Sequence, residues 1–311
     1  MDHAPILCKS VGMDDEPSIP VIHRLTSTRI ALGDRLPPHM YFLVSAVFHY
    51  LGPAFAVLLF ARVEPLGVAW LRIASAALIF AVWRRPWRYF LLQGAAARWN
   101  IVGLGVVLGC MNICFYLAID RLPLGAVGAI EFLGPISLAL AGTRTQRNVV
   151  ALAVAVAGVW MLTHVRFAGA PTGFVYAFAN CALFMLYIVL GHRAAKDGGG
   201  EGIDRLAAAM LVALLLVMPF GLHDAAVALA SPGLLAAGIG IGISSSVIPY
   251  VCDQLAMARL PRATFALLLA LLPATASVIG IVVLHQMPSP IEMTGIALVI
   301  VGVKLHRVSR R

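Results

Sequence analysis

Charged residues are scarce in this sequence of 311 residues. Asp, Glu, Lys and Arg make up 12% of the chain, whereas hydrophobic residues make up 61%. A soluble domain carries about twice that charged fraction, roughly 25%. The composition therefore excludes an ordinary soluble globular protein.

Metal and nucleotide motifs are also missing from the sequence. The five cysteines form no Cys-x-x-Cys pair and no Cys/His cluster at zinc spacing. There is no Gly-x-x-x-x-Gly-Lys-Ser/Thr phosphate loop, and the glycines within 238–243 do not form a dinucleotide fingerprint. We therefore expect no metal site and no cofactor.

The hydrophobic residues form blocks long enough for a helix to cross a hydrocarbon core about 30 Å thick. Ten such blocks lie at residues 37–60, 65–83, 99–119, 123–142, 147–163, 171–190, 203–221, 232–257, 261–284 and 289–305. Within lipid a helix satisfies its own backbone hydrogen bonds, and the alternating strands of a porin are not seen. The sequence predicts an all-α, polytopic membrane protein with ten transmembrane helices.

The basic residues decide how the protein is oriented. The formal net charge is +9, which alone would also suit a nucleic-acid partner. With the N-terminus inside, however, nineteen of the 23 Lys and Arg residues fall in inner segments, and only Arg62, Arg121 and Arg166 lie outside. This positive-inside bias predicts a multi-pass plasma-membrane protein whose basic loops face anionic lipid head groups rather than nucleic acid.

The two ends of the chain differ from the spans. Residues 1–36 are polar and lack the apolar core of a secretory signal, so we expect a cytoplasmic tail. Residues 306–311 are predicted to be a basic cytoplasmic C-terminus, which places both termini on the same side of the membrane.

An internal repeat relates the two halves of the chain. At an offset of 138 positions, "CFYLAIDRLP" (114–123) falls on "CDQLAMARLP" (252–261), and Pro135 falls on Pro273. The repeats, 37–163 and 171–305, hold five predicted helices each, and an odd number forces opposite orientations. Inverted repeats are typical of secondary transporters that hold the substrate near the midplane between the halves. Pro135 and Pro273 are predicted helix breaks, because proline removes a backbone hydrogen bond.

Four segments carry a resemblance to a known family. They are "LGCMNICFYLAIDRLPLGAVGAIEFLGP", "SSSVIPYVCDQLAMARLPRATFALLLALLPA", "GVAWLRIASAALIF" and "LYIVLGHRAA". Over about residues 40–305 the chain resembles the threonine/homoserine exporter branch of the drug/metabolite transporter superfamily, with EamA-type repeats. The resemblance implies a ten-helix inner-membrane carrier that exports small metabolites, most simply amino acids, and implies no enzyme activity.

The chain departs from that family pattern at two places. The family usually has Glu-Pro in the ninth helix, where this chain has Leu272-Pro273, and Gly-Glu after it, where this chain has His285-Gln286. Both changes remove a carboxylate. They leave open a drug or other-metabolite exporter of the same superfamily. An intramembrane transferase is a remote alternative, and the sequence assigns no oligomeric state.

Two ionisable residues lie at membrane depth. Glu131 is about 12 Å into the fourth span at 1.5 Å per residue, and Arg72 lies at nearly the same depth in the second. Isolated charges there cost about 2.5–3.5 kcal/mol each, so such residues pair or line water. We expect an Arg72–Glu131 pair, which either pins two helices together or forms a working substrate or coupling site.

Other polar side chains could belong to the same substrate or coupling site. The candidates are His49, Asn112, Tyr116, Asn180, Tyr187, Tyr250, Asp253 and Gln254. A zwitterionic substrate needs donors for its carboxylate and acceptors for its ammonium group, which Arg72 and Glu131 with the Asn amides would supply. Taken singly, each of these polar residues also fits an interhelical hydrogen bond, and His49 also fits a packed neutral histidine.

Overall fold

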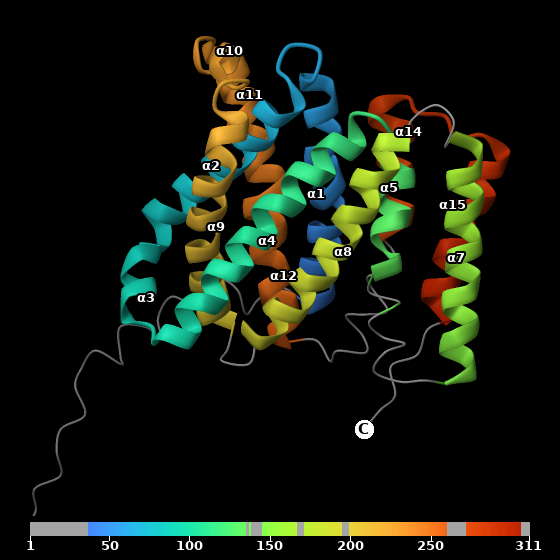
Figure 1. Ribbon diagram of the computed structural model, residues 1–311, viewed down its shortest axis with the longest axis horizontal. Coiled ribbons are helices and arrows are strands. Elements are labelled where there is room, and N and C mark those ends of the chain that lie inside the picture. Colours follow the sequence, from blue (N-terminus) through green and yellow to red (C-terminus); the bar gives the residue numbers. More distant parts are fainter. Residues whose placement is uncertain are drawn as a thin grey trace, which may run out of the picture. The chain divides into compact units, whose positions relative to one another are not determined.

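The computed structural model describes residues 37–134, 137, 145–166, 171–194, 199–259 and 272–305. The predictions for the tail 1–36, for Pro135 and for 306–311 lie outside these residues. Within the described residues every regular element is a helix (Figure 1).

Six of the described helical segments are long and apolar enough to cross a membrane. They are α1 (Pro38–Leu59), α2 (Pro65–Arg84), α4 (Ala95–Ile119), α8 (Pro171–Ala194), α9 (Gly199–Gly221) and the continuous α11 (Pro232–Gly242), η4 (Ile243–Val247) and α12 (Ile248–Arg259). These segments coincide with six of the predicted spans. The prediction of an all-helical, multi-pass membrane protein is confirmed at this level.

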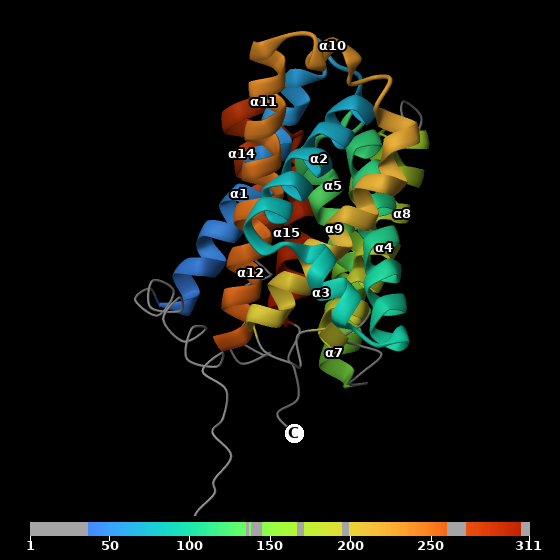
Figure 2. The same ribbon diagram turned by 90° about the vertical axis from the view of Figure 1, so that its left-hand side faces the viewer.

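The other four predicted spans overlap described helices that are not among these six. These are α5 (Leu124–Glu131), α7 (Gln146–Arg166), α14 (Leu272–Leu284) and α15 (Pro290–Leu305). Two short helices, α3 (Pro86–Leu92) and α10 (Ala226–Leu229), were not predicted. Both views place α3 and α10 at opposite ends of the helices (Figures 1 and 2).

Proline and backbone geometry fix several helix ends. Proline is the first residue of α2, α3 and α11, where its missing N–H has no intrahelical partner to lose. After α2, Arg85 adopts a left-handed conformation with φ of 52°, and its N–H bonds the Ala81 carbonyl. The chain therefore turns sharply between α2 and α3.

Glycines allow close packing of α4 against α9. A methyl group on Gly105 would lie 2.5 Å from Val212 Cβ, and one on Gly109 would lie 2.8 Å from Leu216 Cδ2. Gly103, on another face of α4, has no atom within 4 Å of such a methyl group. Gly105 and Gly109, two small residues spaced four apart, therefore mediate a close helix contact.

Helices of the two halves pack against each other throughout. In the first half, α1 contacts α12 and α14, α2 contacts α9 and α11, and α4 contacts α8 and α9. Residues Pro38–Arg311 therefore form one compact unit. Polar side chains in its centre can therefore meet partners from helices of the other half.

Candidate functional site

Glu131 ends α5 and is almost completely buried, with 3% of its surface exposed. The Tyr50 hydroxyl of α1 donates a hydrogen bond to Oε2 over 3.2 Å, and Asn180 Nδ2 of α8 donates one to Oε1 over 3.1 Å. Two neutral donors from different helices thus hold the carboxylate. Hydrogen bonds to a charged group contribute about 1.5–3 kcal/mol each.

Arg72 on α2 is also buried, and it donates hydrogen bonds to residues of the predicted span 232–257. Its Nε donates to Ser246 Oγ and its Nη2 to the Ser245 carbonyl oxygen, each over 2.9 Å. The guanidinium carbon lies 5.6 Å from the centroid of the Tyr116 ring. Ser245 and Ser246 belong to η4, a π-helical turn, and such turns are frequent at functional sites.

The predicted direct ion pair between Arg72 and Glu131 is not formed. Among the described residues, the ion pairs are Arg84–Asp204 and Arg121–Asp120. The Arg72 guanidinium bonds η4, and the Glu131 carboxylate bonds α1 and α8. Their charges interact through space without contact. The centre therefore has a donor-rich pole at Arg72 and an acceptor-rich pole at Glu131.

Three buried polar atoms at these poles have no hydrogen-bond partner among the described residues. They are Tyr116 Oη, Ser245 Oγ and Asn180 Oδ1. Tyr116 and Ser245 are the residues that contact Arg72, and Asn180 is bonded to Glu131. An unsatisfied buried polar atom costs about 1–3 kcal/mol, so these atoms favour a polar ligand in the centre.

An aromatic series continues from this centre. Tyr187 stacks on Phe184 with ring centroids 6.0 Å apart and lies 6.4 Å from Tyr250. Phe184 in turn makes an edge contact with Phe132, the residue after Glu131. The structure thus brings the predicted candidates Tyr187 and Tyr250 together, on the α8 and α12 sides of the centre.

Other predicted candidates hold helices together. Asn112 Nδ2 donates to the Ala69 carbonyl over 3.1 Å, which joins α4 to α2. His49 packs edge-on against Tyr50, with ring centroids 5.2 Å apart. Gln254 is buried close to α9, since a methyl group on Gly202 would lie 2.4 Å from Gln254 Oε1. These contacts fit the interhelical alternative that the sequence left open.

Asp253 forms a second polar contact between α12 and α1. Ser45 Oγ donates a hydrogen bond to Asp253 Oδ1, and Ser45 Oγ is also 3.3 Å from the Pro249 carbonyl oxygen. Sequence analysis missed Ser45. The available signal was its spacing from His49, since residues four apart share a helix face.

The predicted helix breaks are only partly visible. Pro135 lies outside the described residues, and Pro273 is the second residue of α14. Ser277 Oγ donates a hydrogen bond to the Pro273 carbonyl over 2.9 Å, one turn further along α14. Among the described residues, no group of three or more His, Cys, Asp or Glu side chains could hold a metal ion.

Comparison with known proteins assigns the family. The threonine/homoserine exporter RhtA of Escherichia coli K12 is 34% identical over 256 residues, which cover 80% of this chain and 84% of that protein. The exporter of the same name from Salmonella typhimurium LT2 is 32% identical over the same coverage. Residues 171–306 match the EamA-like transporter family. The chain belongs to this transporter family.

One solved structure shares the fold of this chain. It is 17% identical in sequence and superimposes with a TM-score of 0.56, covering 86% of this chain and 96% of the other. In this EamA-type chain the buried polar centre is therefore part of a transporter. The resemblance stated from the sequence, to the threonine/homoserine exporter branch, is confirmed.

Proposed function

We propose that the protein exports small zwitterionic metabolites, most simply amino acids such as threonine or homoserine. The carboxylate of the substrate would bind at Arg72, with the hydroxyls of Tyr116 and Ser245. Its ammonium group would bind at Glu131, with the carboxamide oxygen of Asn180. Export rather than catalysis is also what the relatives named threonine/homoserine exporter favour.

One observation carries this proposal: residues of the second half hold both buried charges of the first half. Arg72 is bonded by Ser245 and Ser246, and Glu131 by Asn180. In transporters with inverted repeats, the substrate binds at the interface of the repeats, and rocking of the halves exposes it to each side in turn. A charge pair that only pinned two helices would be in direct contact.

Equivalent contacts at opposite ends support two inverted five-helix repeats with ten crossings. Arg121 and Arg259 occupy the same position in the "RLP" motif of each repeat. The Arg121 guanidinium lies 5.4 Å from the Tyr176 ring at the start of α8, and Arg259 lies 5.7 Å from the Tyr41 ring at the start of α1. Each arginine thus contacts the first helix of the other repeat. Together with the positive-inside bias, these contacts support a topology with both termini in the cytoplasm.

An exporter of larger organic molecules is the second candidate. The series Phe132, Phe184, Tyr187 and Tyr250 favours an aromatic or apolar substrate group beside the charged centre. The loss of the usual carboxylates at Leu272 and Gln286 points the same way.

Counterflow in proteoliposomes tests the proposal. Vesicles loaded with unlabelled threonine should accumulate labelled threonine or homoserine, and Glu131→Ala should abolish this exchange. A panel of other amino acids and of aromatic organic cations separates the two candidates. Exchange of the cations without exchange of any amino acid would reject the amino-acid assignment.

A further inference from the structure

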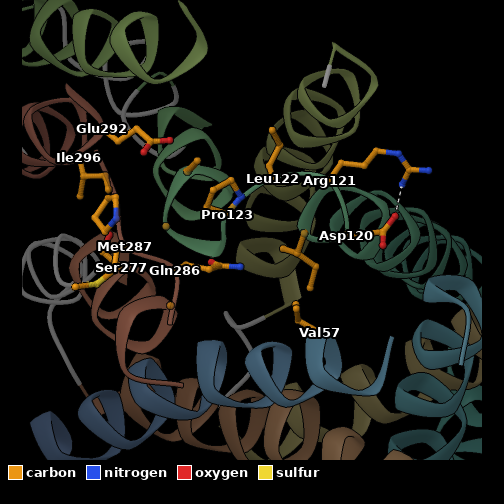
Figure 3. Close-up of a pocket in the computed structure, with 15 residues that line it drawn as sticks. Val57, Asp120, Arg121, Leu122, Pro123, Ser277, Gln286, Met287, Glu292 and Ile296 are labelled. Atoms are coloured by element: carbon orange, nitrogen blue, oxygen red, sulfur yellow. Dashed lines mark hydrogen bonds and ion pairs between the residues drawn. The ribbon is translucent and has the colours of Figure 1, made fainter. Parts of the chain in front are cut away.

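Asp253 is a second carboxylate within a membrane-spanning segment, and it forms no ion pair with any of the described residues. Two other acidic residues of the described chain are paired with arginine. Asp204 on α9 lies 2.6 Å from Arg84 on α2. Asp120 lies 2.9 Å from Arg121, beside the cavity between α1, α5 and α14 (Figure 3). Asp253 therefore differs from these residues in what surrounds its carboxyl group.

One hydroxyl group serves two acceptors at Asp253. Ser45 Oγ of α1 is buried and lies within hydrogen-bond distance of Asp253 Oδ1 and of the Pro249 carbonyl oxygen, which is 3.3 Å away. A serine hydroxyl has a single proton to donate, so it cannot bond both acceptors fully at once. While Asp253 is ionised, this contact between α1 and α12 has one donor too few.

A proton on Asp253 supplies the missing donor. The Asp253 O–H would donate to Ser45 Oγ, and the Ser45 O–H would then donate to the Pro249 carbonyl, because a hydroxyl accepts as well as donates. When Asp253 is ionised, the Ser45 O–H donates to the carboxylate instead. Both forms of Asp253 thus keep a hydrogen bond to Ser45. The geometry fits a group that gains and loses a proton in place.

Pro249 joins this contact to the substrate centre. Proline has no N–H, so the carbonyl of Ser245, one turn earlier, receives no α-helical hydrogen bond from it. Arg72 Nη2 donates to this carbonyl over 2.9 Å. Asp253 lies one turn after Pro249. Arg72 and Ser45 therefore bond successive turns of the same membrane-spanning segment, on either side of one proline.

The charges of the two sites also act on a common side chain. The Tyr250 hydroxyl lies within electrostatic range of Arg72, Glu131 and Asp253. An ionised Asp253 therefore adds a second negative charge near the Arg72–Glu131 centre, and protonation removes it. Opposite charges attract more strongly in a protein interior than in water. The ionised form of Asp253 thus favours an ammonium group at Glu131, and the protonated form lacks this attraction.

Other ionisable groups surround Asp253 and bear on its response to pH. They are Tyr250, Cys252 and Arg259 on α12, Tyr187 on α8, Tyr41 and His49 on α1, and Glu201, Asp204 and Arg205 on α9. An unperturbed histidine changes its charge between about pH 5 and 8. His49 is therefore the group in this set whose protonation has to be separated from that of Asp253.

We propose that Asp253 is the proton-binding residue of the exporter, separate from Glu131, and that it releases its proton when an amino acid binds at Arg72 and Glu131. This inference rests on the proposed function. The proton of the Asp253 carboxyl group passes to solvent, the Ser45 hydroxyl turns to the carboxylate, and the ammonium group of the substrate binds at Glu131. In reverse, a proton taken up by Asp253 promotes release of the amino acid.

Proton release on binding tests this inference. Purified wild-type protein in weakly buffered detergent solution is mixed with threonine, while a pH indicator counts released protons and calorimetry counts bound threonine. Because binding selects the deprotonated form, the dissociation constant should fall as the pH rises from about 5 to about 8, by up to about tenfold per pH unit. At the acidic end we expect about one proton released per threonine bound.

Three variants assign the proton. Asp253→Asn keeps a neutral donor to Ser45, so it should bind threonine as weakly as the wild type does at low pH, at every pH and without proton release. Asp253→Glu keeps a carboxyl group and should keep the release. Glu64→Gln removes an exposed carboxylate and is the matched control, which should behave as the wild type does.

Two results would overturn the inference. One is proton release that survives in Asp253→Asn, and its loss in His49→Gln would then assign the proton to His49. The other is threonine binding by the wild type without proton release and without pH dependence, a result that requires no variant to fold. Absence of any threonine binding by the wild-type protein would instead reject the proposed function.

Discussion

The Tyr50 hydroxyl donates a hydrogen bond to Glu131 Oε2 over 3.2 Å and so joins α1 to α5 at the centre of the protein. The same hydroxyl would lie 3.1 Å from a methyl group on Gly128, one turn before Glu131. Tyr50 therefore contacts both the Glu131 side chain and the turn of α5 that precedes it. A change at Tyr50 should affect transport more than folding.

Tyr50→Phe tests this relationship. The substitution keeps the ring and its contact with His49 but removes the donor to Glu131. Because a hydrogen bond to a charged group contributes about 1.5–3 kcal/mol, we expect counterflow to fall about tenfold at near-normal abundance. Tyr89→Phe is the matched control, since the Tyr89 hydroxyl has no partner among the described residues. Equal counterflow in both variants would contradict the role of Tyr50.

The double variant Arg72→Leu with Glu131→Gln separates a structural charge pair from a working site. Because the two charges interact only through space, removing one leaves the other buried with neutral hydrogen-bond partners alone, whereas replacing both leaves neither charge in the centre. We expect the double variant to insert at higher abundance than Arg72→Leu alone and yet to show no counterflow. Quantitative blotting and counterflow measure the two effects. Wild-type exchange by the double variant would reduce both residues to structural counter-ions.

The α4–α9 contact gives a stability prediction with an internal control. Gly105→Ala forces a methyl group to 2.5 Å from Val212, so it should lower the free energy of unfolding by about 1–3 kcal/mol. Gly103→Ala, two residues away in open space, should be neutral or stabilise the helix by up to about 1 kcal/mol. Thermal unfolding in detergent measures both. The same midpoint for the two variants would contradict the tight contact.

His285 gives a second stability prediction. Its φ of 54° is left-handed, a conformation that costs about 1–2 kcal/mol for residues other than glycine. His285→Gly should therefore raise the thermal midpoint by about 2–4 °C. His223→Gly, in the turn before α10, lacks a positive φ and should not raise it. A lower midpoint for His285→Gly would show that the imidazole makes a compensating contact.

The inverted topology predicts the labelling of two introduced cysteines. In a background without native cysteines, Ser231→Cys should react with a membrane-impermeant maleimide from outside, and Gly199→Cys only after permeabilisation. Ser231 precedes α11 and Gly199 begins α9, at the two ends of adjacent crossings. Labelling of both from one side would rule out the proposed topology.

The helices were predictable because lipid imposes a simple rule on the sequence. The predicted span 65–83 and the observed α2, Pro65–Arg84, agree almost to the residue, since proline begins the helix and arginine ends the apolar block. The short connectors α3 and α10 were missed, because a helix of one or two turns carries no transmembrane-length signal. The close contact of α4 with α9 has a simple signal in the sequence, because Gly105 and Gly109 are small residues spaced four apart.

The sequence named residues for the candidate site, but it did not predict which side chains would be in contact. Depth along a helix places Arg72 and Glu131 at the same level, but depth says nothing of the direction in which each side chain points. In the structure Arg72 points to Ser245 and Ser246, and Glu131 to Tyr50 and Asn180. Those partners come from residues up to 174 positions away, and only the packing of all the helices decides them.

The π turn at Ile243–Val247 lies between α11 and α12 and sets the direction in which the α12 side chains point relative to those of α11. Each residue of an α-helix turns the chain by about 100°, and a π turn holds one residue more than an α turn. This phase offset aims Tyr250 toward Tyr187 and Asp253 toward Ser45, while the Ser245 carbonyl faces Arg72. Conversion of this π turn to an α turn would rotate α12 about its own axis. The turn that accepts the hydrogen bonds of Arg72 is therefore also the turn that sets the orientation of the α12 side chains.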